Sequence, residues 1–289
     1  MDIQSQSNLH FGWFSATHEN FTSNAINKIS TSSIPALKNF SAMLENVSQK
    51  PSNDMDIQIQ RKFKFGGADI FKFFYNIYKK VKGDTVNLAN PSSTPSKTFF
   101  ELLKESTQKP DFDERGLFGN WHFFSPTINK SYLDFNGKNN ALYHYKMHVS
   151  NMLSAISEKN IEQVMEHAGR ALHFLQDGTQ PMHSKGCTFF NTFTCFKTHR
   201  SFEKFLEKCQ DKFFKSNKYK PSHFDTFEDL YMNNVALSQK SELPTSKNKY
   251  DWESIGETGV RQAMDSTRDF LEKLAMMLDD SQISTSFVN

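Results

Sequence analysis

Long apolar runs are missing from this 289-residue chain, and so is a strong net charge. No stretch approaches the eighteen or more apolar residues that a membrane-spanning helix needs. The segment from Met1 to Gly12 is polar and has no apolar core of a signal peptide, so a secreted protein would need a leader outside this sequence or a specialised export route. The net charge of +2 gives no general attraction to nucleic acid.

Cysteine is scarce as well, with only Cys187, Cys195 and Cys209 in the chain. Cys187 and Cys195 are close enough in sequence to form a disulfide across a short loop, and free thiols fit the pattern equally well. The redox state therefore stays open.

Period-two alternation, the pattern of a half-buried strand, is rare, and there are no internal repeats or coiled-coil heptads. Apolar residues instead recur every three or four positions in long stretches, which predicts helices. The expected fold class is all-α, and the length favours a single domain over residues 1–289. The expected helices are Ala141–Ile156, Ile161–Asp177, Ser201–Phe214 and Gly256–Leu278.

Two histidine–carboxylate pairs stand out. His173 and Asp177 are four residues apart, as are His199 and Glu203, and this spacing places both members of a pair on one face of a helix. His183 lies between the pairs. A single such histidine is more often a core or capping residue, but imidazole and carboxylate together are the ligands of a zinc site, so the constellation favours a metallohydrolase.

The predicted path of the chain allows His183 to share a site with His173 and Asp177. An apolar stripe predicts a helix from about Glu162 to Asp177, and Gly178 and Pro181 end it. The bend that follows turns the chain back. We therefore expect His183 to approach the same site from beyond the bend.

These motifs resemble those of the bacterial zinc-dependent phospholipases C, which include the phosphatidylcholine-preferring enzymes and the catalytic domain of the clostridial α-toxin. The family pattern of His-aromatic-x-x-Asp, Pro-x-His and His-x-x-x-Glu is matched here by H-F-L-Q-D, P-M-H and H-R-S-F-E. The match extends upstream to N-W-H-F-F-S-P, P-D-F-D and A-T-H-E-N-F, and spans nearly the whole chain except a segment at about residues 50–98. The upstream motifs contribute His122, Asp111 and His18.

The resemblance implies a single helical domain of the zinc phospholipase C and single-strand nuclease type, with up to three zinc ions. One ion is expected to use Asp111, His122, His173 and Asp177. A second is expected to use His183, His199 and Glu203. The third would share Asp177 and use His18.

The third ion is where this sequence departs from the family pattern. Relatives complete that site with the free amino group of an N-terminal tryptophan, whereas this chain begins with Met1. There are three alternatives. Processing exposes the amino group of Trp13, a different residue such as His10 serves as the ligand, or the third ion is weakly bound or absent.

The chemistry follows from the metal ions. Zinc lowers the pKa of bound water from about 15.7 to about 7, and paired ions can hold both sides of a displacement at phosphorus. Phosphodiester hydrolysis is therefore the expected reaction, with Asp111 orienting or deprotonating the attacking water. The alternative is that Asp111 is an ordinary exposed acid in a loop, because Asp113 and Glu114 follow it. Asp69 is the second candidate for the ligand position assigned to Asp111. The resemblance places Phe112 against the choline cation.

The segment without a family match is rich in basic and aromatic residues. From Arg61 to Lys82 it carries seven basic residues and one acid, Asp69, with large apolar side chains between them. This mixture suits the headgroup region of an anionic membrane, so we expect a phospholipid surface as partner. A helical hairpin packed on the body of the protein is an equally good interpretation.

Two further functions remain open: a single-strand zinc nuclease of the same fold, and a non-catalytic metal-stabilised binding protein. The nucleases usually end their ligand set with Asp, whereas this chain has Glu203. His144 and His148 are also four apart, but nothing in their sequence context adds a third ligand. We expect them to be structural or surface residues.

Overall fold

The computed structural model describes residues 15–48, 97–186, 192–216, 219–245 and 247–287. The helices discussed below belong to one compact unit within residues 1–47 and 97–289. The expected insert at about 50–98, with Asp69 and the segment from Arg61 to Lys82, lies outside the described residues except at its end. Val47 and Thr98, which flank it, form an antiparallel bridge with each other.

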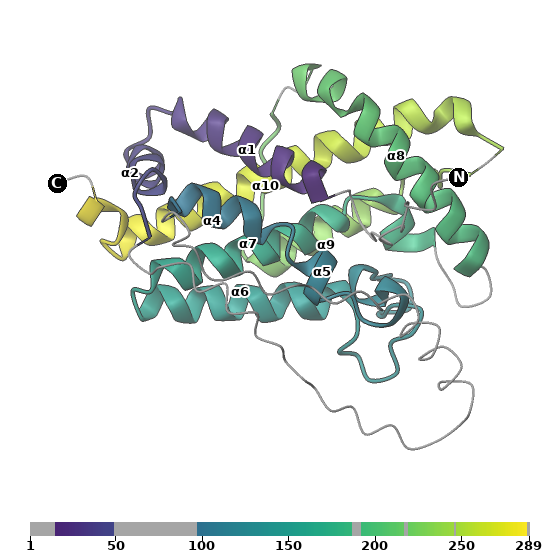
Figure 1. Cartoon of the computed structure of the whole chain (residues 1–289), viewed down its shortest axis with the longest axis horizontal. Coiled ribbons are helices and arrows are strands. Elements are labelled where there is room, and N and C mark those ends of the chain that lie inside the picture. The colour runs from purple at the N-terminus through teal and green to yellow at the C-terminus, as the bar shows by residue number, and fades with distance from the viewer. Residues whose placement is uncertain (1–14, 49–96, 187–191, 217–218, 246, 288–289) are drawn as a thin grey trace, which may run out of the picture. The chain divides into compact units, whose positions relative to one another are not determined.

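The described chain is helical, which confirms the predicted all-α class (Figure 1). It contains isolated bridges but no strand among the described residues. None of the described helices combines the length and the apolar character that crossing a membrane requires. The α-helices are α1 (Ser15–Ser30), α2 (Pro35–Leu44), α4 (Phe99–Ser106), α5 (Pro110–Asp113), α6 (Ala141–Ser157), α7 (Ile161–Asp177), α8 (Thr192–Ser216), α9 (Phe227–Ser238) and α10 (Trp252–Asp280), and the short helical turns are η1 (Leu117–His122), η2 (Met182–Gly186), η4 (Lys249–Asp251) and η5 (Ser284–Phe287).

Helix α7 is the centre of the unit. It runs antiparallel beside α6 and also packs against α4 and α10 (Figure 1). The side chain of Asn160 caps its first turn by accepting a hydrogen bond from the Gln163 amide. Every residue from Ala171 to Asp177 is buried, so the last turns of α7 have no solvent face. Polar side chains in these turns must find partners inside the protein.

A glycine allows α4 to approach α7 closely. A Cβ at Gly169 would lie 2.5 Å from the carbonyl oxygen of Leu103 and 2.6 Å from Cβ of Ser106, which is closer than atoms can pack. The absence of a side chain at Gly169 thus brings the C-terminal end of α4, and Thr107 after it, against α7. This close approach positions part of the site described below.

The observed helices α6 and α7 begin where the apolar spacing predicted. Helix α8 begins at Thr192, nine residues before the predicted start at Ser201. His199 is therefore inside the helix, so His199 and Glu203 do share one helical face.

Candidate metal centre

The structure brings all eight predicted ligand residues into one buried cluster. They come from six elements of the fold, and none is more than 2% exposed to solvent. Three groups of these side chains have donor atoms within 4.8 Å of one another. The contributing residues are His18 of α1, Asp111 of α5, His122 of η1, His173 and Asp177 of α7, His183 of η2, and His199 and Glu203 of α8.

Asp177 is the hub of the cluster. Its Oδ2 lies 2.8 Å from Nδ1 of His122, 3.2 Å from Nε2 of His173 and 3.7 Å from Nδ1 of His183. Its Oδ1 lies 3.5 Å from Nε2 of His18. The end of α7 thus supplies a carboxylate that reaches histidines from four elements.

A second group lies where η2 meets α8. Nε2 of His183 and Nε2 of His199 are 2.8 Å apart, and Nε2 of His199 lies 2.7 Å from Oε1 of Glu203. Nε2 of His183 is 4.0 Å from the same oxygen. Donor atoms that share a tetrahedral zinc ion lie about 3.3 Å apart, and these separations fall around that value.

Asp111 is buried, so its interpretation as an exposed loop acid is wrong. It is only 1% exposed, and its Oδ1 lies 3.9 Å from Nε2 of His173. It forms a group of three potential ligands with His18 and His173. Asp113, two residues later, is exposed.

The orientation of three histidines is fixed by oxygen atoms behind them. Nδ1 of His173 is 2.7 Å from the Thr107 carbonyl, and Nδ1 of His183 is 2.9 Å from the His122 carbonyl. Nδ1 of His18 is 2.7 Å from Oε1 of Gln176. Because a carbonyl oxygen only accepts, each Nδ1 must carry the proton, and in the neutral ring the lone pair is then on Nε2. Such oxygen partners are typical behind metal-bound histidines.

The protonation states also suit metal binding. Burial lowers the pKa of His122, His183 and His199 to about 4, about 3 and about 4, so these rings are neutral at pH 7. Neutral imidazole is the form that binds a metal. Burial disfavours a charge on His173, but the carboxylates of Asp177 and Asp111 outweigh it and raise its pKa to about 9. The two carboxylates thus favour a positive charge at Nε2 of His173. Either a proton on this nitrogen or a metal cation bound to it provides that charge.

Several buried polar atoms in the cluster have no hydrogen-bond partner within the described part of the chain. They are Nε2 of His18, Nε2 of His122 and both carboxylate oxygens of Asp111. Buried polar atoms are nearly always paired, so these atoms indicate a further group at their centre. Histidine nitrogens with carboxylate oxygens form a donor set that suits zinc. The residues therefore fit the predicted cofactor.

Other residues singled out from the sequence lie outside the buried cluster or outside the described part of the chain. Phe112 follows Asp111 on α5 and is 59% exposed, so its ring is accessible to a ligand from solvent. Trp13, His10 and Cys187 lie outside the described residues, as does the side chain of Cys195. Cys209 is a free cysteine.

A second polar cluster lies beside the first and centres on Glu114, which sequence reasoning did not single out. Its carboxylate is 3.1 Å from Nδ1 of His144 and 2.9 Å from Nε2 of His148. It also forms an ion pair with Arg170 of α7. His144 and His148 are buried, which excludes the surface position that was one of the two expectations for them. Their spacing on α6 predicted a shared face but gave no sign of Glu114 as the partner.

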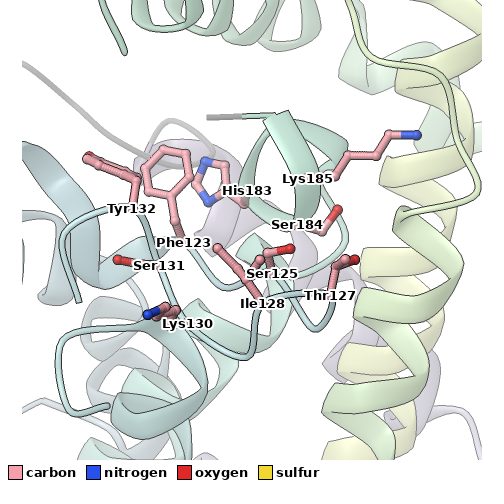
Figure 2. A pocket seen from close by; sticks show the side chains of 10 residues that line it. All are labelled: Phe123, Ser125, Thr127, Ile128, Lys130, Ser131, Tyr132, His183, Ser184 and Lys185. Atoms are coloured by element: carbon pink, nitrogen blue, oxygen red, sulfur yellow. The ribbon is translucent and has the colours of Figure 1, made fainter. Parts of the chain in front are cut away.

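An open cavity of about 230 Å³ adjoins His183 (Figure 2). The ring of Phe123 stacks on His183 with 4.5 Å between ring centres, and Tyr132 meets Phe123 edge-on. The amino group of Lys185 points away from the cavity, because it binds the Gln239 and Ser241 carbonyls. The remaining lining comes from Ser184 of η2 and from residues between Ser125 and Tyr132 in the loop after Phe123.

Two solved α-toxin structures share this fold. Alpha-toxin from Clostridium absonum matches over 95% of this chain and 66% of its own, with a TM-score of 0.54 and 15% identity. Alpha-toxin of Clostridium perfringens from the avian strain SWCP matches over 96% of this chain and 65% of its own, with a TM-score of 0.53 and 15% identity. This chain therefore spans just under two thirds of the length of either toxin. The likeness establishes the α-toxin fold.

At the level of sequence families, no family model matches the chain. No curated protein matches it either.

Proposed function

We propose that this protein is a zinc-dependent phospholipase C. It hydrolyses the glycerol-side phosphodiester bond of phospholipids such as phosphatidylcholine and releases diacylglycerol and the phosphorylated headgroup. One observation carries the proposal: eight buried histidine and carboxylate side chains, Asp177 among them, form one cluster in a fold shared with α-toxins. The sequence resemblance assigns these same residues as the ligands of up to three zinc ions.

The proposed chemistry divides between the metal and the chain. When bound by these histidines and carboxylates, zinc would supply positive charge and would lower the pKa of a bound water. Asp111 orients or deprotonates the attacking water, the role that the family resemblance implies for it, and its carboxylate is buried beside Nε2 of His173. The water oxygen bonds to phosphorus as one of its protons passes to Asp111, and the bond from phosphorus to the glycerol oxygen breaks. That oxygen takes up a proton from solvent and leaves as the hydroxyl group of diacylglycerol, and Asp111 returns its proton to solvent.

The headgroup side of the site is assigned to Phe112. Its exposed ring follows Asp111 directly, and an aromatic face attracts a quaternary ammonium group such as choline. Action outside the producing cell is part of the proposal, because the same activity inside would damage the producer's own membranes.

Parallel assays on phosphatidylcholine and on single-stranded DNA, with and without added zinc, test the proposal. We expect zinc-dependent release of phosphorylated headgroup and no DNA cleavage. DNA cleavage without lipid hydrolysis would identify a nuclease of the same fold instead. Zinc binding without turnover of either substrate would identify a metal-stabilised binding protein.

A further inference from the structure

The loop between η1 and α6 has a fixed shape. Ser125 and Lys130 pair through two backbone hydrogen bonds, of 3.1 and 3.3 Å, and close a tight turn with Ile128 near its tip. A second turn follows, closed by Asp134. The buried carboxylate of Asp134 accepts hydrogen bonds from the Asn139 amide and from the side chain of Asn140.

The second turn is also tied to the body of the protein. The Asn139 carbonyl accepts hydrogen bonds from Asn120 of η1 and from the Ser131 hydroxyl, each at 3.1 Å. Gly137 has a φ of +72°, a conformation that glycine adopts without strain. Buried polar partners therefore hold the tip of this turn in place.

Both turns place apolar side chains in solvent. Phe135 is 89% exposed and Ile128 is 55% exposed. Burial of a large apolar side chain is favourable, and these two are not completely buried within the described fold. A loop that is fixed by buried polar contacts and yet displays phenylalanine outward is suited to insertion into an apolar medium.

The exposed charges of the loop are positive. Lys130 follows Ile128 by two residues, Lys138 follows Phe135 by three, and both lysines are exposed. Neither forms an ion pair with another described residue, while Asp134, the acid of the loop, is buried. An exposed lysine beside an exposed apolar residue suits the surface of a bilayer, because the lysine can contact lipid phosphates while the apolar side chain enters the acyl region.

The same loop borders the candidate metal centre. Ile128, Lys130 and Tyr132 line the cavity beside His183 (Figure 2). The turn at Ile128 therefore lies at the cavity next to a predicted zinc ligand.

We propose that the turns at Ile128 and Phe135, with Lys130 and Lys138, form a docking surface for a phospholipid bilayer. Phe135 and Ile128 enter the acyl boundary, and the two lysines contact lipid phosphates. Docking here delivers lipid to the cavity beside His183. The inference rests on the proposed phospholipase function for its biological meaning, but the surface is defined by its own residues and is independent of the segment from Arg61 to Lys82.

The test uses the full chain with F135S, I128S and the double variant. Tyr250 of η4 provides a matched control, because it is 82% exposed and lies outside the loop, so Y250S removes a similar apolar group elsewhere. Binding is measured by sedimentation with vesicles of mixed phosphatidylcholine and phosphatidylserine. Hydrolysis is measured on these vesicles and on monomeric short-chain phosphatidylcholine.

We expect the double variant to lose about tenfold or more in vesicle partition and in vesicle hydrolysis, because two apolar groups no longer enter the bilayer. Hydrolysis of the monomeric substrate by F135S should stay at the wild-type level, because Phe135 does not line the cavity beside His183. Y250S should behave as wild type in every assay. K130E combined with K138E should lower binding to anionic vesicles by a similar factor.

Equal vesicle binding by the double variant and Y250S would overturn the docking surface. Absence of vesicle binding by the wild-type protein would overturn it as well. If no phospholipid is hydrolysed but vesicle binding still depends on Phe135, the proposed function fails while the docking surface stands.

Discussion

His18 and Gln176 are 158 positions apart in sequence, and the side-chain oxygen of Gln176 lies 2.7 Å from Nδ1 of the His18 ring. The amide nitrogen of Gln176 donates to the Thr267 hydroxyl at 3.0 Å, which fixes the amide so that its oxygen faces His18. Helices α1, α7 and α10 are thereby joined through one amide. Its role is to turn Nε2 of His18 toward Asp177 and the other predicted ligands.

Replacing Gln176 with leucine should weaken zinc binding about 10- to 100-fold, because His18 loses the partner that fixes its orientation. Competition with a chromophoric chelator measures the change. Q163L is the control, since Gln163 lies in the first turn of α7, at the opposite end of the helix from Gln176. Equal zinc affinity in both variants would show that Gln176 does not position His18.

His173→Ala and Asp177→Ala should each abolish hydrolysis of phosphatidylcholine and lower the zinc content. Each substitution removes a potential metal ligand from the group in which the Asp177 carboxylate lies close to four histidines. Elemental analysis of purified protein gives the zinc content, and circular dichroism tests whether the helices persist. Full zinc content and activity in either variant would contradict the assignment.

The fold class could be predicted from the sequence because it depends on local periodicity. The starts of α6 and α7 follow from the spacing of apolar residues, and Gly178 follows the last residue of α7 as predicted. The i and i+4 spacing likewise predicted that His173 and Asp177 would share a face. The convergence of all eight residues rested on resemblance to a family, and their role as zinc ligands stays a prediction.

Other features depend on contacts between helices that no spacing encodes. Glu114 reaches His144, and Gln176 reaches His18, only because α5, α6, α7 and α1 pack as they do. The same holds for Gly169, whose importance appears only when α4 is seen against α7. A pattern within one helix carries no information about which helix lies beside it.

Gly169→Ala should destabilise the protein by about 1–3 kcal/mol, because the new methyl group would press on the backbone of α4. Urea unfolding measures the free energy. Gly178→Ala is the matched control: its Cβ would meet mainly the side chain of Val235, at 3.2 Å, which can move. We expect that control to change stability by much less, and a similar loss in both variants would contradict the close approach of α4.

The carboxylate of Glu114 should make stability depend on pH. Burial disfavours its charge, but hydrogen bonds from His144 and His148 and the charge of Arg170 outweigh burial, so the pKa of Glu114 is lowered below its ordinary value of 4.5. A carboxyl with a lowered pKa in the folded state stabilises the protein above pH 4.5, and this contribution is lost as the pH falls toward the folded pKa.

Glu114→Gln should therefore cost about 3 kcal/mol of unfolding free energy at pH 7, because Arg170 loses a buried partner. The difference from wild type should shrink steadily below pH 4.5, where protonation removes the same charge from the wild-type protein. Urea unfolding across this pH range, with both proteins in the same buffers, measures it. E158Q provides the control, since Glu158 is exposed at the end of α6 and forms no ion pair with a described residue. A difference between wild type and E114Q that stays constant with pH would show that the charge of Glu114 does not contribute to stability.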